Sequence, residues 1–145
     1  MTPIVRSVLA LLLGVIVGVV LISATEMVEH LVFPPPEGID PTDRDAMKAL
    51  IASMPVGGFV ILLLGWFLGS FAGAWVAARV AGRLPVLHGL IVGFLFLLAA
   101  IANMLRFPHP TWVWIVGCSL FLPAAYLGAW LAEKKPRVPV QLPGH

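Results

Sequence analysis

Four long apolar runs, separated by short polar stretches, dominate the chain. They cover residues 4–24, 56–80, 84–105 and 111–132. Each run reaches the roughly 20 residues that a helix needs to cross about 30 Å of hydrocarbon. The pattern therefore predicts an all-α integral membrane protein, folded as an antiparallel bundle of four transmembrane helices.

The polar residues around these runs set the expected boundaries of a single transmembrane domain that covers residues 1–145. The domain is divided into transmembrane helices at 4–32, 55–81, 84–106 and 110–133, an outer insert at 36–54 and a cytoplasmic tail at 134–145.

Small residues recur every four positions along the second span, and the first span repeats this spacing once. Residues four apart lie on one face of a helix, so they form a groove in which another backbone can lie close. We expect the groove to be filled by packing inside the bundle or, alternatively, by a second copy of the chain. The helix-packing candidates are Gly65, Gly69, Gly73 and Ala77 in the second span, and Gly14 and Gly18 in the first.

Two short internal matches predict that the bundle consists of two similar helical hairpins. "LVFPPP" at 31–36 matches "LRFPHP" at 105–110 with an offset of 74 residues, and "FAGAWVAAR" at 71–79 matches "YLGAWLAEK" at 126–134 with an offset of 55. The matches occur in the same order and on the expected sides of the membrane, as in a pseudo-two-fold repeat. The difference between the offsets predicts an insert of 19 residues in the first hairpin.

The insert has the pattern of a short amphipathic helix. Asp40 before Pro41, and Thr42 three positions before Asp45, are helix-start signals. We expect this helix to have one apolar side, to lie on the outer surface and to stop or kink near Pro55. That side consists of Ala46, Met47, Leu50, Ile51 and Met54.

Composition and charge support a membrane protein and give it a direction. The chain is 60% hydrophobic and 11% charged, with a mean hydropathy of +1.01, and its basic residues form no patch with interleaved aromatics of the kind that binds nucleic acid. Basic residues orient membrane proteins toward the cytoplasm. We therefore expect a bacterial plasma membrane protein with both termini cytoplasmic. Six basic residues fall on the face with the termini, Arg6, Arg79, Arg83, Lys134, Lys135 and Arg137, against Arg44, Lys48 and Arg106 on the other.

The first span ends in a polar cluster that is the main candidate site. Glu26, Glu29 and His30 are three and four residues apart, so they project from one side of the helix. Near-membrane ionisable groups are often functional, and an interfacial salt-bridge network is the structural alternative. In the repeat, Asn103 and Arg106 occupy the matching end of the third span, and we expect Arg106 to neutralise one of the glutamates.

A divalent metal is a further hypothesis for the same cluster. Glu26 and His30 have the spacing of two ligands on one helix face, and His109 in the third loop is a candidate third donor. Trp66 lies nearer the middle of the second span, where its indole N–H needs a partner, so we expect it to face another helix or to find a carbonyl group.

The sequence ranks three functions. The single Cys118 lies in a span. No nucleophile–base set or phosphate-binding loop is present in the sequence, which disfavours an enzyme. No cofactor is predicted. The first hypothesis is a non-enzymatic protein that binds or assembles with a partner or small ligand at its outer face, the partners being the lipid bilayer and a second copy or another membrane protein. The second is a small transporter or ion conductor with an acidic mouth, and the third is a divalent-metal-binding membrane protein.

Overall fold

The computed structural model describes residues 2–40 and 42–134, which form helices and connecting loops without a strand. Four helices are long and apolar enough to cross a membrane. The predicted all-helical fold, with four helices able to cross a membrane, is therefore confirmed. The predicted tail lies outside the described residues apart from Lys134. The helices are α1 (Pro3–Val32), α2 (Arg44–Ser53), α3 (Val56–Ala81), α4 (Pro85–Arg106) and α5 (Thr111–Lys134).

Local signals explain where several helices begin and end. Thr2 caps α1 by accepting a hydrogen bond from the Val5 amide at 3.4 Å, and α3 ends at Gly82, whose φ of 73° is easily adopted only without a side chain. The N-cap of α2 is Asp43, which accepts from the amides of residues 45 and 46. Thr42, part of the expected start signal, instead donates to Asp40.

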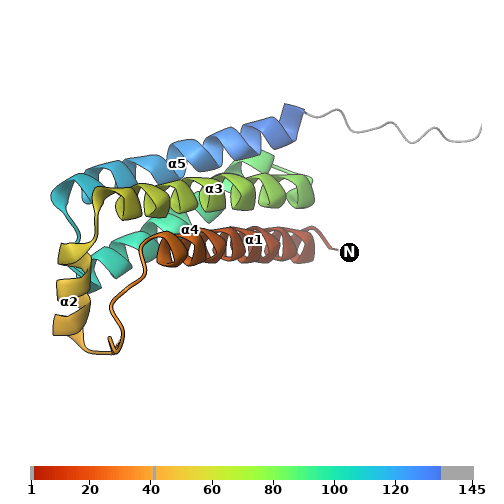
Figure 1. Cartoon of the computed structure of the whole chain (residues 1–145). Helices are drawn as coiled ribbons and strands as arrows, with labels where there is room; N and C mark the ends of the chain where they lie inside the picture. The colour runs from red at the N-terminus through yellow and green to blue at the C-terminus, as the bar shows by residue number, and fades with distance from the viewer. Residues whose placement is uncertain (1, 41, 135–145) are drawn as a thin grey trace, which may run out of the picture.

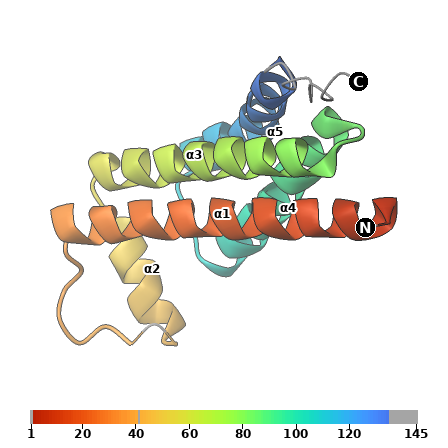
Figure 2. The same ribbon diagram turned by 90° about the vertical axis from the view of Figure 1, so that its right-hand side faces the viewer.

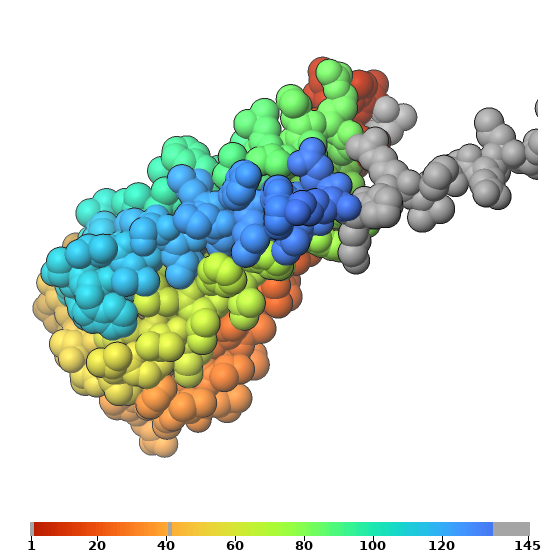
Figure 3. Space-filling view, turned by 90° about the horizontal axis from the view of Figure 1, so that it is seen from above, coloured from red at the N-terminus to blue at the C-terminus, as the bar shows by residue number. Residues whose placement is uncertain are grey.

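Helix α3 lies at the centre of the described chain, in contact with α1, α4 and α5. Figure 1 shows α1, α3 and α5 in successive layers, with α4 behind them and α2 across one end. In the space-filling view of Figure 3, α5 lies between α4 and α3, and α1 borders α3 on the side away from α5. We call the end that carries α2 the α2 end, and the opposite end, with the start of α1 and the α3–α4 turn, the Arg6 end.

The contact between α1 and α3 brings the two backbones together. A Cβ added at Gly14 would lie 2.6 Å from the carbonyl oxygen of Gly73, and one added at Gly69 would lie 2.8 Å from that of Gly18. Neither distance leaves room for a side chain, so small residues are required here. Figures 1 and 2 show the two helices side by side along their length.

Much of the remaining surface of α1 faces outward. Among its described residues only Ala10, Gly14, Gly18 and Glu29 are buried, whereas Ile4 and Leu31 are each 77% exposed. Apolar surface of this extent suits a hydrocarbon environment. At the α2 end, Ile51 on α2 is buried and joins the same apolar core as Met104 of α4.

Candidate functional site

A cleft between α1 and α4 is the principal cavity near the predicted cluster. Beside Gly14 and Gly18, α1 meets Val92 and Phe96 of α4, and Figure 2 shows α4 crossing behind α1 at an angle. Toward the α2 end the space between them is open and measures about 450 Å³. We call it the α1–α4 cleft; it is lined by Val15, Val19, Ile22, Ser23, Glu26, Trp66, Leu95, Phe96, Ala99, Ala100, Asn103 and Phe121.

The cleft combines a polar end with a long apolar wall. Glu26, partly buried, and the exposed Ser23 and Asn103 supply its polar side chains near the α2 end. Trp66 is 5% exposed, and its ring packs on that of Phe121 with 5.4 Å between centroids. Its indole N–H donates to no group among residues 2–40 and 42–134, so it is available to a molecule in the cleft.

Glu29 lies on the other side of α1, against the start of α3. It is 8% exposed, and a Cβ added at Gly58 would lie 3.3 Å from its Oε1. The N-cap of α3 is Pro55, which provides no side-chain hydrogen bond. A carboxylate near an uncapped helix N-terminus is stabilising, so Glu29 has a structural explanation that Glu26 lacks.

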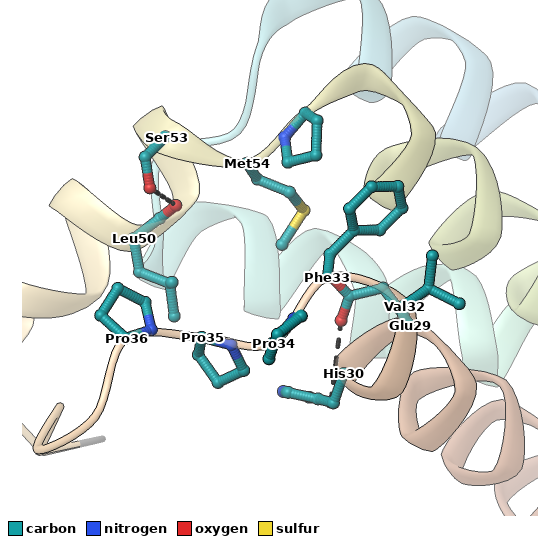
Figure 4. Close-up of a pocket in the computed structure, with 11 residues that line it drawn as sticks. Glu29, His30, Val32, Phe33, Pro34, Pro35, Pro36, Leu50, Ser53 and Met54 are labelled. Carbon is teal, nitrogen blue, oxygen red and sulfur yellow. Dashed lines mark hydrogen bonds and ion pairs between the residues drawn. The ribbon is translucent and has the colours of Figure 1, made fainter.

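A second cavity, of about 380 Å³, lies under α2 and is shown in Figure 4. Glu29 and His30 face it beside three consecutive prolines, and the Nδ1 of His30 is 3.7 Å from Oε2 of Glu29. The same nitrogen lies 2.7 Å from the carbonyl oxygen of Glu26. His30 therefore lines the α2 cavity, whereas the Glu26 side chain lines the α1–α4 cleft.

The residues predicted to lie opposite the glutamates do not lie together either. Asn103 shares the cleft with Glu26, but Arg106 forms no ion pair with a glutamate in the described part of the chain, and its guanidinium lies 5.3 Å from the ring centre of Phe107. His109 is 2.8 Å from the carbonyl of Phe107 and meets the edge of the Phe59 ring.

The metal hypothesis finds no assembled ligand set in residues 2–40 and 42–134. Within these ranges, no group of three or more His, Cys, Asp or Glu side chains is placed to hold a metal ion. Glu26, His30 and His109 have the right chemistry but are directed to different places.

The loop before α2 carries one electrostatic feature of its own. The Thr42 hydroxyl and amide both donate to Oδ1 of Asp40, at 2.6 and 2.8 Å. These bonds favour the carboxylate and lower the pKa of Asp40 below its ordinary value. The side chain is fully exposed, so this is a local property of the loop.

Of the residues that line the cleft, the sequence predicts Glu26 and Asn103 as site residues but does not indicate the apolar wall or Ser23. A serine three residues before a candidate glutamate lies on a neighbouring part of the same helix face, and that spacing was the available signal. Comparison with known protein families, curated proteins and solved structures finds no match.

Proposed function

We propose that the protein is a non-enzymatic membrane protein that binds a small amphipathic ligand in the α1–α4 cleft. The observation that carries the proposal is a cavity of about 450 Å³, within the usual range of about 300–1,000 Å³ for ligand pockets. Its few polar groups are gathered at one end, whereas the remainder is apolar. Such a lining matches a molecule with one polar group and a hydrocarbon chain.

The polar end favours a ligand whose head group donates hydrogen bonds. The Glu26 carboxyl and the Asn103 amide oxygen both accept hydrogen bonds, and a primary amine supplies up to three donors. The chain of such a ligand would follow Val15, Val19 and Phe96 into the bundle. We therefore propose a long-chain amine or a lipid with an amine head group as the ligand class.

We place this site within an antiparallel bundle of two related hairpins, with the α2 end outside and both termini in the cytoplasm of a bacterial cell. Paired glycines four residues apart support the repeat: Gly14 and Gly18 meet small residues of α3, and Gly89 and Gly93 meet Ala129 and Ala125 of α5. In this arrangement the glycine groove of α3 is filled within one chain.

A transporter is the second candidate, and one observation favours it. The cleft passes from Glu26 to Trp66, inside the spans. Its deeper wall is apolar, which suits a hydrocarbon chain better than a hydrated ion. Binding without conduction is therefore the first choice.

Quenching of tryptophan fluorescence tests the proposal. In a chain with its four other tryptophans replaced by phenylalanine, Trp66 is the only reporter; those four are Trp75, Trp112, Trp114 and Trp130. A stearylamine carrying bromine atoms on its chain should quench Trp66 at lower concentration than the equally brominated alcohol or carboxylic acid. Glu26→Gln should remove the preference for the amine, because the carboxyl oxygens that accept its protons are reduced to one amide oxygen.

Three results would contradict or redirect the proposal. Equal quenching by all three head groups would show partition into the micelle without a site, and absent quenching would remove the cleft as a ligand site. Uptake of the amine by vesicles that contain the protein, above the uptake of empty vesicles, would favour the transporter.

A further inference from the structure

A second cavity at the Arg6 end is cationic, in contrast to the α1–α4 cleft. It measures about 460 Å³ and lies between the start of α1 and the α3–α4 turn. The space-filling view shows these two segments beside each other (Figure 3). We call it the Arg6 cavity; it is lined by Pro3, Ile4, Arg6, Ser7, Val8, Leu11, Ala81, Gly82, Arg83, Leu84 and His88.

The position of Arg6 is fixed by the end of α3. Its Nε donates to the carbonyl of Val80 at 2.6 Å, and a Cβ added at Gly82 would lie 2.6 Å from its Nη2. The absence of a side chain at Gly82 thus lets the guanidinium lie against the turn. Arginine can pair with an anion through its two terminal nitrogens while its Nε donates elsewhere.

Arg83 adds a second positive charge to the cavity. Arg83 forms no hydrogen bond or ion pair among the described residues, and His88, 8% exposed, is placed by a 3.0 Å contact of its Nδ1 with the carbonyl of Leu84. The cavity also borders the start of α4, whose N-cap Leu84 gives no side-chain hydrogen bond. No acidic side chain is among the lining residues.

We propose that the Arg6 cavity binds an anionic phosphate group, held by Arg6 and Arg83. Arginine pairs with phosphate through parallel N–H···O bonds, and the uncapped start of α4 contributes a positive potential. Ile4, Val8 and Leu84, which are 77%, 50% and 64% exposed, form an apolar rim. Such a rim at the end of membrane-crossing helices is suited to the acyl chains of an anionic phospholipid, and a free phosphate shares the same head-group chemistry.

Native mass spectrometry of the full chain in a neutral detergent tests the site. The protein should retain one dioleoyl phosphatidic acid in preference to dioleoyl phosphatidylcholine. Arg83→Gln should weaken the retention about tenfold through the loss of a charge-assisted contact, and Arg83→Lys should keep part of it. Since Arg83 has no partner in the described structure, the thermal unfolding of Arg83→Gln should match that of the unchanged protein.

Arg79→Gln is the matched control for charge at the same end. Arg79 lies outside the cavity lining, donates to the carbonyl of Ala132 at 3.2 Å and lies over the Trp75 ring. Its replacement should leave lipid retention within about twofold. An equal loss in both variants, or equal retention of the two lipids, would overturn the site.

Inorganic phosphate separates the two sources of the anion. If the site is for a lipid, an excess of inorganic phosphate should leave the bound phosphatidic acid in place, because phosphate lacks the acyl chains that contact the rim. Displacement by inorganic phosphate in the unchanged protein but not in Arg83→Gln would assign the cavity to a soluble phosphate.

Discussion

The two sides of α1 meet their neighbours in opposite ways. Toward α3 the backbones touch, because Gly14 and Gly18 face Gly73 and Gly69. Toward α4 the same glycines meet larger side chains, and a Cβ at Gly18 would overlap the ring of Phe96. That ring holds the backbone of α4 away from α1, and the α1–α4 cleft opens beyond it. The size of the facing residue therefore decides whether α1 forms a closed contact or one wall of a cavity.

Leucine in the contact between α1 and α3 should have the largest effect on stability. Gly73→Leu would place atoms where a Cβ alone lies 2.6 Å from the carbonyl oxygen of Gly14, and a backbone oxygen has little freedom to move. We expect a loss of about 3 kcal/mol in the free energy of unfolding, or failure to fold. Unfolding in mixed detergent micelles, followed by circular dichroism, would measure it.

Ala24→Leu on the exposed side of α1 is the control for added apolar volume. It should change stability by no more than about 0.5 kcal/mol. If both variants unfold like the unchanged protein, the close contact between α1 and α3 does not stabilise the bundle.

A bulky side chain in the α1–α4 cleft should weaken ligand binding and leave stability unchanged. Ala99 is exposed and lines the cleft, so Ala99→Phe would place a ring in the space proposed for the ligand chain. We expect the affinity for the brominated amine to fall about tenfold, in line with the loss of roughly two buried methylenes. The Trp66 quenching titration would measure the change.

Ala102→Phe is the matched control on α4, because Ala102 is exposed but does not line the cleft. Its amine affinity should equal that of the unchanged chain. A similar loss in both variants would mean that the amine binds through the outer surface of α4.

The four apolar helices could be predicted from the sequence, but the α1–α4 cleft could not. Length and hydropathy are local properties, so the four apolar runs correspond to α1, α3, α4 and α5 within two residues at every boundary except one. Helix α1 continues to Val32, beyond the end of the first run at residue 24. The cleft depends on the angle between α1 and α4 and on where one ring, that of Phe96, falls. Neither property is encoded in the spacing of apolar residues along a single helix.

The same limit explains why the predicted cluster is divided. Residues three apart on a helix differ by about 60° in direction, which sequence reasoning treats as one face. Here α3 borders one edge of that face and the cleft borders the other. Glu29 consequently lies at the start of α3, whereas Glu26 lies in the cleft.

Exchanging each glutamate for glutamine should separate these two environments. Glu29→Gln removes a carboxylate from the start of α3 and should lower the free energy of unfolding by about 0.5–1 kcal/mol, with amine binding unchanged. Glu26→Gln should leave stability within about 0.5 kcal/mol but remove the preference for the amine. Unfolding and quenching measured on both variants check the pair, and a loss of stability in Glu26→Gln alone would reverse the assignment.

The smallest expected effect concerns Thr25, where the closed contact continues toward the α2 end. Its side chain lies against Gly65, but its hydroxyl donates within α1, to the carbonyl of Ile22 at 2.7 Å. The same hydroxyl is also 3.2 Å from the carbonyl oxygen of Leu21. Thr25→Val keeps the shape and removes only these hydrogen bonds within α1, so the free energy of unfolding should change by less than about 0.5 kcal/mol. Thr25→Leu, measured in the same detergent titration, should cost more, because the space above Gly65 admits no longer side chain. A loss of about 1 kcal/mol in the valine variant would show that the hydroxyl stabilises the contact between α1 and α3. The shape of the side chain would then not be sufficient for that contact.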